Sequence, residues 1–157
     1  MPTQIESHLL DYQGSFTNTS VYEQAPVSVS NVIETSQKWG VILEWTMTGV
    51  EARRGRGHWK VNVLLESMGP GSEYKLPGAG PVVIENSDGT WDPIAGTRTF
   101  ANIAGKLPVE IDPAVDNVVP GTYLLTATIQ YYDDADVPFP VSGFFEGPML
   151  EFYNPGP

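Results

Sequence analysis

Most of the arginines of this 157-residue chain lie in one stretch, TGVEARRGRGHWKV, residues 48–61. A guanidinium can hold a carboxylate or a phosphate through two parallel hydrogen bonds, so such a cluster is typical of a surface that grips an acidic group. Glycines in the stretch allow the backbone to turn sharply between two flanking strands. We therefore predict a binding surface made of the basic side chains Arg53, Arg54, Arg56, His58 and Lys60.

The rest of the chain is strongly acidic. The whole chain contains 19 Asp and Glu residues and eight Lys and Arg residues, which gives a formal net charge of −11. This excess repels nucleic acid and anionic lipid at long range, so neither nucleic acid nor a membrane is an expected partner. A carboxylate-rich protein surface is favoured instead, including the surface of another copy of this chain. The alternative interpretation of the arginine stretch is a solvated hairpin tip whose positive charges only relieve repulsion among the nearby acidic residues.

Catalytic chemistry has little support in the residue types. The chain has no cysteine and two histidines, His8 and His58, and it lacks the G-x-S-x-G sequence of a serine nucleophile. Glu44 and Glu66 fall on neighbouring predicted strands, but on the side expected to face solvent. We predict that the protein is not an enzyme and needs no cofactor.

Two acidic segments could offer hard oxygen ligands to calcium. They are YYDDADVPFP, with Asp133, Asp134 and Asp136, and ENSDGTWD, with Glu85, Asp88 and Asp92. Neither has the spacing of an EF-hand, and acidic turns are expected in a chain of this charge. Solvated turns are favoured, and no metal site is predicted.

Trp91 follows an SDG turn, a place where an indole has little reason to be buried. It could stack on a sugar while Asp88 and Asp92 accept hydrogen bonds from hydroxyls. The alternative is that the ring opens a strand and packs at the rim of the fold. A small carbohydrate-binding module centred on Trp91 is thus a second functional hypothesis, with a glycan or another small molecule as ligand.

The elements that must position these side chains are strands. Apolar and polar residues alternate in WGVILEWTM (39–47), HWKVNVLLE (58–66) and TYLLTATIQYY (122–132). A period of two over this length is typical of a strand with one buried and one solvated face. Weaker strand patterns cover residues 14–22, 27–34, 81–85, 97–103, 108–111 and 148–153.

Sixteen glycines and 14 prolines separate these patterns, and no segment has the period of an amphipathic helix. We therefore predict one all-β domain over residues 1–157, an antiparallel sandwich of about 7–9 strands without substantial helix. Residues 1–13 and 154–157 are expected to be mobile, and residues 14–35 to form an edge or exchanged strand.

Two segments resemble strands of known folds. PGTYLLTATIQYYDD is similar to the strand F region of immunoglobulin-like and fibronectin-III-like sandwiches, and VILEWTM resembles a core strand of such domains. The resemblance implies that Tyr123 bonds back to the backbone of the 116–120 turn and that Trp45 is buried. The paired cysteines of antibody domains are absent. Because a fold does not assign a function, the resemblance extends to architecture alone.

These observations predict a soluble, non-catalytic protein-binding or assembly module that acts through loop tips and an edge strand. The N-terminal residues lack the basic and apolar regions of a signal peptide, and no run approaches the roughly 20 apolar residues of a membrane span. A cytoplasmic location is expected, which leaves release by a non-classical route open.

Overall fold

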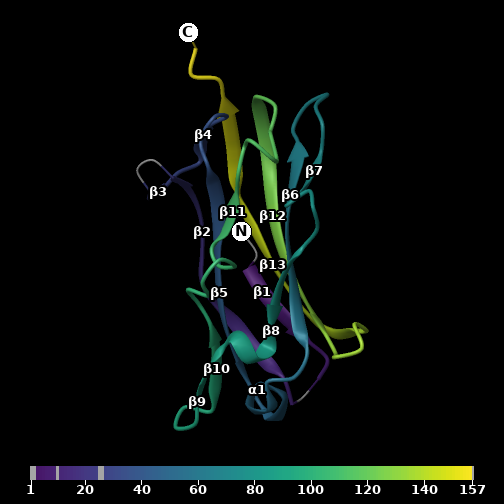
Figure 1. The fold of residues 1–157 in the computed structure, drawn as a ribbon. Helices are drawn as coiled ribbons and strands as arrows, with labels where there is room; N and C mark the ends of the chain where they lie inside the picture. The colour runs from purple at the N-terminus through teal and green to yellow at the C-terminus, as the bar shows by residue number, and fades with distance from the viewer. Residues whose placement is uncertain (1–2, 10, 25–26, 157) are drawn as a thin grey trace.

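A computed structural model describes residues 3–9, 11–24 and 27–156 as two β-sheets packed face to face, with one short helix at one end (Figure 1). The first sheet has seven strands. These are β1 (Thr3–Ser7), β4 (Val32–Glu34), β6 (His58–Ser67), β7 (Tyr74–Leu76), β8 (Val82–Glu85), β12 (Gly121–Tyr132) and β13 (Pro138–Tyr153).

The second sheet has six strands. These are β2 (Gln13–Gln24), β3 (Val27–Val29), β5 (Trp39–Thr48), β9 (Thr90–Asp92), β10 (Thr97–Phe100) and β11 (Val109–Ile111). The helix α1 (Val50–Arg54) connects β5 to β6, and the 3-10 turn η1 (Asn86–Asp88) connects β8 to β9. The chain therefore changes sheets at both of these short helical segments.

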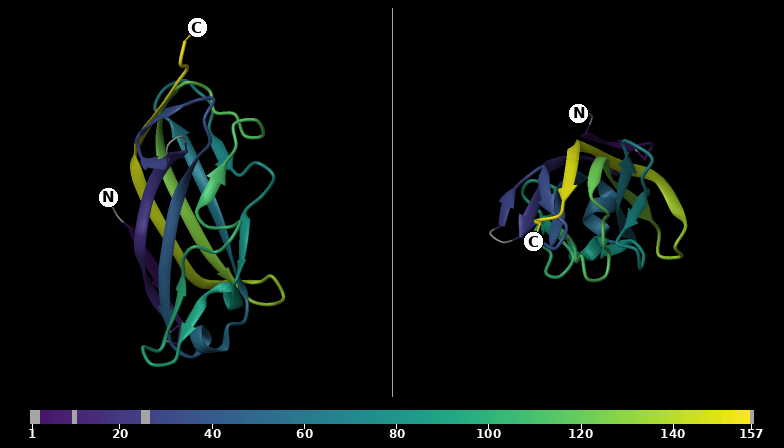
Figure 2. Two further views of the ribbon diagram at one scale, coloured as in Figure 1. Left: turned by 60° about the vertical axis from the view of Figure 1, so that its left-hand side comes forward. Right: turned by 90° about the horizontal axis from the view of Figure 1, so that it is seen from above.

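The strand order is β1-β13-β12-β6-β7 in the seven-stranded sheet, where β4 also pairs with β13 and β8 with β6. It is β3-β2-β5-β10-β9 in the other sheet, where β11 also pairs with β5. All of these pairs are antiparallel except β4 with β13. The predicted all-β antiparallel sandwich is confirmed, and the arrangement is compatible with an immunoglobulin-like fold (Figure 2).

Aromatic rings from both sheets fill the core. Trp45 of β5 is fully buried, 4.9 Å from the ring centroid of Phe100 and 5.4 Å from that of Trp59. The buried ring of Tyr131 lies 5.2 Å from Trp59. The burial of Trp45, Trp59 and Tyr131 confirms that the apolar face of each of the three central predicted strands points into the core.

The turn before β12 has the geometry that the resemblance implied. Tyr123 is buried, and its hydroxyl donates a 2.6 Å hydrogen bond to the carbonyl of Val119. This bond ties the start of β12 to the preceding turn.

The last strand is much longer than predicted. β13 begins at Pro138, whereas its sequence pattern indicated only residues 148–153. Its inward positions include Gly143, where an added Cβ would lie 2.9 Å from Ile5 and 3.0 Å from Phe16. Glycine is required there by close packing, so the inward position carries no apolar side chain and the alternation is hidden in the sequence.

The N-terminal residues also differ from expectation. Within the range 1–13, which we expected to be mobile, Thr3–Ser7 form β1 and pair residue by residue with β13. Residues 1, 2 and 10 lie outside the described part of the chain, as does residue 157 at the other end. Of the predicted edge segment 14–35, β2 pairs along nearly all of its length with β5, and residues 25–26 are not described.

Candidate functional site

The segment that carries the arginine cluster, residues 49–57, is called the arginine loop below. It does not form a hairpin tip, because β5 belongs to one sheet and β6 to the other. It crosses between the sheets at one end of the sandwich (Figure 1). Gly49 and Gly55 adopt positive φ angles of 104° and 65°, which begin and end α1. The side chains of Arg53, Arg54 and Arg56 are exposed, while Ala52 packs into the core.

The fourth arginine, Arg98 of β10, holds this loop from inside. Its side chain is buried, and its guanidinium donates to the carbonyls of Ala52 at 2.6 Å, Gly89 at 2.8 Å and Arg53 at 3.4 Å. Carbonyls at the end of a helix have no partner within the helix, so Arg98 supplies the missing donors at the end of α1. Arg98 has one signal in the sequence, an inward position in the pattern TRTF, and this signal alone does not predict an anchoring role.

Two further anchors hold the end of the arginine loop. The Tyr131 hydroxyl donates a 2.6 Å hydrogen bond to the carbonyl of Arg56, and the Gly57 N–H donates to Asp134 Oδ1 at 2.9 Å. Burial raises the pKa of Tyr131 to about 12, so its hydroxyl keeps its proton at neutral pH. Hydrogen bonds to side chains of β10, of β12 and of the turn after β12 therefore fix the backbone of the arginine loop.

The two other predicted binding residues, His58 and Lys60, both contact Asp136. The His58 Nε2 lies 2.8 Å and the Lys60 Nζ 2.9 Å from its Oδ1 atom. Hydrogen bonds from Lys60 and then His58 hold the pKa of Asp136 below its ordinary value. These two side chains are engaged within the chain, and Arg54 pairs with Glu51 at 3.1 Å, which leaves Arg53 and Arg56 as the unpaired part of the predicted surface among the described residues.

All eight Lys and Arg side chains belong to the described residues, and most have an intramolecular role. Four form ion pairs: Lys38 with Glu110, Arg54 with Glu51, Lys60 with Asp136 and Lys106 with Asp88. Arg98 is buried against carbonyls. Within the described part of the chain, Arg53, Arg56 and Lys75 have no carboxylate within ion-pair distance. Two of these three unpaired cations belong to the arginine loop.

The structure does not bring the predicted sugar-binding residues together. Trp91 is half-buried against the core, and the guanidinium carbon of Arg98 lies 5.8 Å from its ring centroid. Asp88 accepts from Lys106 at 2.9 Å and from the Glu85 N–H at 3.0 Å.

Asp92 follows Trp91 in β9, so the two side chains point to opposite faces of the sheet. The Oδ1 atom of Asp92 accepts the N–H groups of Ile94 at 2.9 Å and Ala95 at 3.2 Å. Both candidate carboxylates are thus occupied in turns.

The acidic loop between β12 and β13 is also organised by its own carboxylates. Asp133 Oδ1 accepts the N–H groups of Ala135 and Val137, both at 2.9 Å. Among the described residues, no group of three or more His, Asp or Glu side chains is arranged to hold a metal ion. Glu44 and Glu66 lie on β5 and β6, which belong to different sheets, so the two predicted strands that carry them are not neighbours within a sheet.

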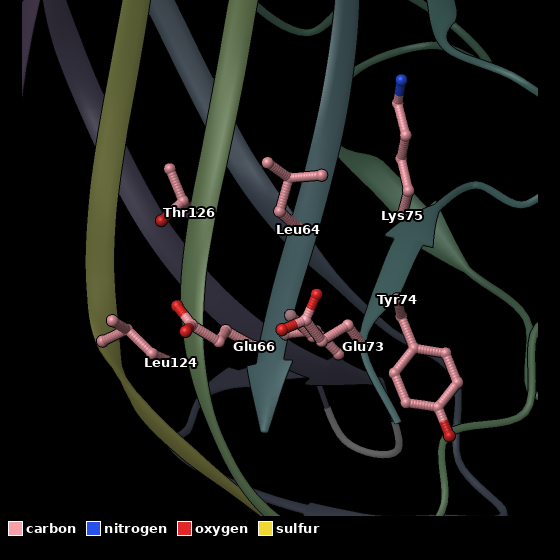
Figure 3. A pocket seen from close by; sticks show the side chains of 8 residues that line it. Leu64, Glu66, Glu73, Tyr74, Lys75, Leu124 and Thr126 are labelled. Carbon is pink, nitrogen blue, oxygen red and sulfur yellow. The ribbon is translucent and has the colours of Figure 1, made fainter. Parts of the chain in front are cut away.

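A shallow pocket lies on the outer face of the seven-stranded sheet, over β6, β7 and β12 (Figure 3). It encloses about 500 Å³, and Leu64 and Leu124 provide apolar surface within it. Glu66 and Glu73 also line it, and they form no ion pair among the described residues. The Lys75 ammonium points away from both carboxylates (Figure 3). The sequence signals for this pocket are Leu64 and Leu124, apolar residues at outward positions of β6 and β12.

None of the described helices is long and apolar enough to cross a membrane. No protein-family model matches this chain, and no curated protein is significantly similar to it in sequence.

Proposed function

We propose that this protein is a non-catalytic binding module with an immunoglobulin-like fold, and that its arginine loop docks on an acidic surface of a protein partner. The strand order and the Tyr123 corner support the fold assignment. The rigid attachment of the arginine loop supports the binding role.

One observation carries the proposal: the backbone of the arginine loop is anchored, while the side chains of Arg53 and Arg56 form no ion pair among the described residues. Arg98, Tyr131 and Asp134 fix three of its backbone groups from separate elements. A loop that is already ordered loses little conformational entropy when it binds, so more of the contact energy appears as affinity.

Opposite charge would guide the encounter. The chain has a net charge of −11, and two of the three cations without an ion pair among the described residues lie in the arginine loop, so an acidic partner is favoured near this loop over most of the remaining surface. Such a contrast orients two proteins before contact and raises the association rate. The attraction is screened beyond about 8 Å at physiological salt, so binding should weaken as salt rises.

An unpaired strand edge offers a second contact. β2 pairs with β3 only at Tyr22–Gln24, and in the described residues the rest of its outer edge has no strand partner. Free backbone groups along such an edge can pair with an extended segment of a partner. We include this edge in the proposed binding surface.

The test is affinity capture from the native cell extract with the immobilised protein, followed by binding to each captured protein in purified form. The Arg53→Ala/Arg56→Ala variant should lose a partner that the wild type retains. The Lys38→Ala/Lys106→Ala variant is the matched control, because it removes the same charge from two cations already paired within the chain. Equal capture by wild type and arginine variant would refute the proposal.

A further inference from the structure

The pocket on the outer face of the seven-stranded sheet has the chemistry to receive an arginine. Leu64 is 37% exposed, and with Leu124 it offers an apolar surface to the aliphatic part of a long side chain. Glu66 and Glu73 stand beside this surface without a cationic partner among the described residues. A guanidinium that bridged them would gain charge-assisted hydrogen bonds.

The charge of the pocket decides which surface can cover it. Two copies that met pocket to pocket would bring their glutamates face to face, and like charges close together oppose such a contact. The occupant must therefore carry positive charge. Among the described residues, the cations without an ion pair are Arg53 and Arg56 in the arginine loop, and Lys75, which itself lines the pocket.

A single molecule cannot make this contact with itself. The arginine loop precedes His58 at one end of β6, and the pocket begins at Leu64 of the same strand. Six residues of strand separate them, about 20 Å at roughly 3.3 Å per residue. Figure 1 shows α1 and β7 in opposite halves of the sandwich. The arginine loop can therefore reach a pocket of this kind only on another molecule.

We infer that the partner of the arginine loop is a second copy of this chain, whose pocket between β6, β7 and β12 receives Arg53 or Arg56. This inference rests on the proposed binding role of the arginine loop. The two contacting surfaces are different, so a pair of molecules keeps one free loop, on one molecule, and one free pocket, on the other. Such a contact produces open chains or closed rings instead of a two-fold dimer.

Sedimentation velocity of the purified full-length protein tests the inference, over a range of concentrations at low and high salt. The wild type should associate as concentration rises, and high salt should weaken the association at least tenfold. Arg53→Ala/Arg56→Ala and Glu66→Gln/Glu73→Gln should each weaken it at least tenfold. Glu6→Gln/Glu44→Gln is the control, since it removes two negative charges away from the pocket, on β1 and β5.

Complementary charge reversal makes the test specific. Arg53→Glu/Arg56→Glu and Glu66→Lys/Glu73→Lys should each remain monomeric alone, because loop and pocket then carry the same sign. An equimolar mixture of the two should associate again, since each loop meets a pocket of opposite charge. Circular dichroism of both variants should match the wild type, which shows that lost association is not lost folding.

The outcomes separate this inference from the proposed function. Association that needs the arginines but not Glu66 and Glu73 would overturn the pocket assignment and keep the binding role of the loop. A wild type that stays monomeric at high concentration, yet captures another protein through its arginines, would overturn self-association alone. Failure of the mixture to associate would also reject the inference.

Discussion

The Tyr131 hydroxyl, which extends from the aromatic core, donates a 2.6 Å hydrogen bond to the backbone carbonyl of Arg56. This bond links a buried ring of β12 directly to the most exposed cationic segment of the molecule. Together with Arg98 it makes the position of the arginine loop depend on the packing of the core. Substitutions in the core of the sandwich should therefore alter the position of the arginine loop, which is the proposed binding surface.

Arg98→Leu should loosen the arginine loop. It removes three hydrogen bonds from a charged donor, each typically worth about 1.5–3 kcal/mol, so we expect a loss of at least about 3 kcal/mol in stability. Trypsin should then cut after Arg53, Arg54 or Arg56 at conditions where the wild type resists. Arg54→Ala is the control, because its exposed ion pair with Glu51 contributes about 0–1 kcal/mol. Unchanged proteolysis of the Arg98 variant would show that the anchor is dispensable.

Trp45→Ala should lower the free energy of unfolding by about 3–5 kcal/mol, as expected when a fully buried aromatic side chain is removed. Urea denaturation measures the effect. Ile94→Ala provides the comparison, since Ile94 is 97% exposed and its loss should change stability by no more than about 0.5 kcal/mol. Similar midpoints for the two variants would contradict the position of Trp45 in the core.

The hydrogen bond of Tyr131 should produce a defined alkaline pH dependence. Burial raises the pKa of Tyr131 to about 12, above the value of about 10 for an unfolded chain. Its contribution to stability is therefore fully present below pH 10 and is lost as pH rises through about 12. Tyr131→Phe leaves the Arg56 carbonyl without this donor and should cost about 1–3 kcal/mol at neutral pH.

The difference in stability between wild type and Tyr131→Phe should stay constant up to about pH 10 and shrink above it. Denaturant titrations of both proteins at a series of pH values measure this. The other buried tyrosines titrate in both proteins, so the comparison isolates Tyr131. A difference that does not change up to pH 12 would speak against a buried, neutral donor.

Chelation should leave the melting temperature unchanged. The carboxylates of Asp133, Asp134 and Asp136 already accept hydrogen bonds from the chain itself. A calcium ion present at a hundred times its dissociation constant would stabilise the fold by about 2.7 kcal/mol, which thermal unfolding detects readily. A melting temperature that falls with EDTA and recovers with calcium would reveal a metal site in this loop.

Local sequence patterns were sufficient to predict the central strands and their inward faces, but not β1, β7, β9 or the first half of β13. Trp45, Val61 and Ile129 follow a strict alternation, and burial of one face imposes that alternation on each strand separately. The Tyr123 corner was implied by the resemblance to immunoglobulin-like strands, and its hydrogen bond joins residues only four positions apart. The exposed arginines were also evident from composition and spacing.

Only the tertiary structure decided which charged side chains have a partner within the chain and which do not. Lys60 and Asp136 are 76 residues apart, and Arg98 lies 46 residues from Ala52, so neither contact can be read from local spacing. The pocket draws Leu64, Glu73 and Leu124 from three strands, whose order in the sheet is set by long-range pairing. Alternation determines which face of a strand is buried, but it carries no information about which strand lies beside it. The arginine cluster was therefore visible in the sequence, whereas its anchors and the acidic pocket emerged only when distant strands were brought side by side.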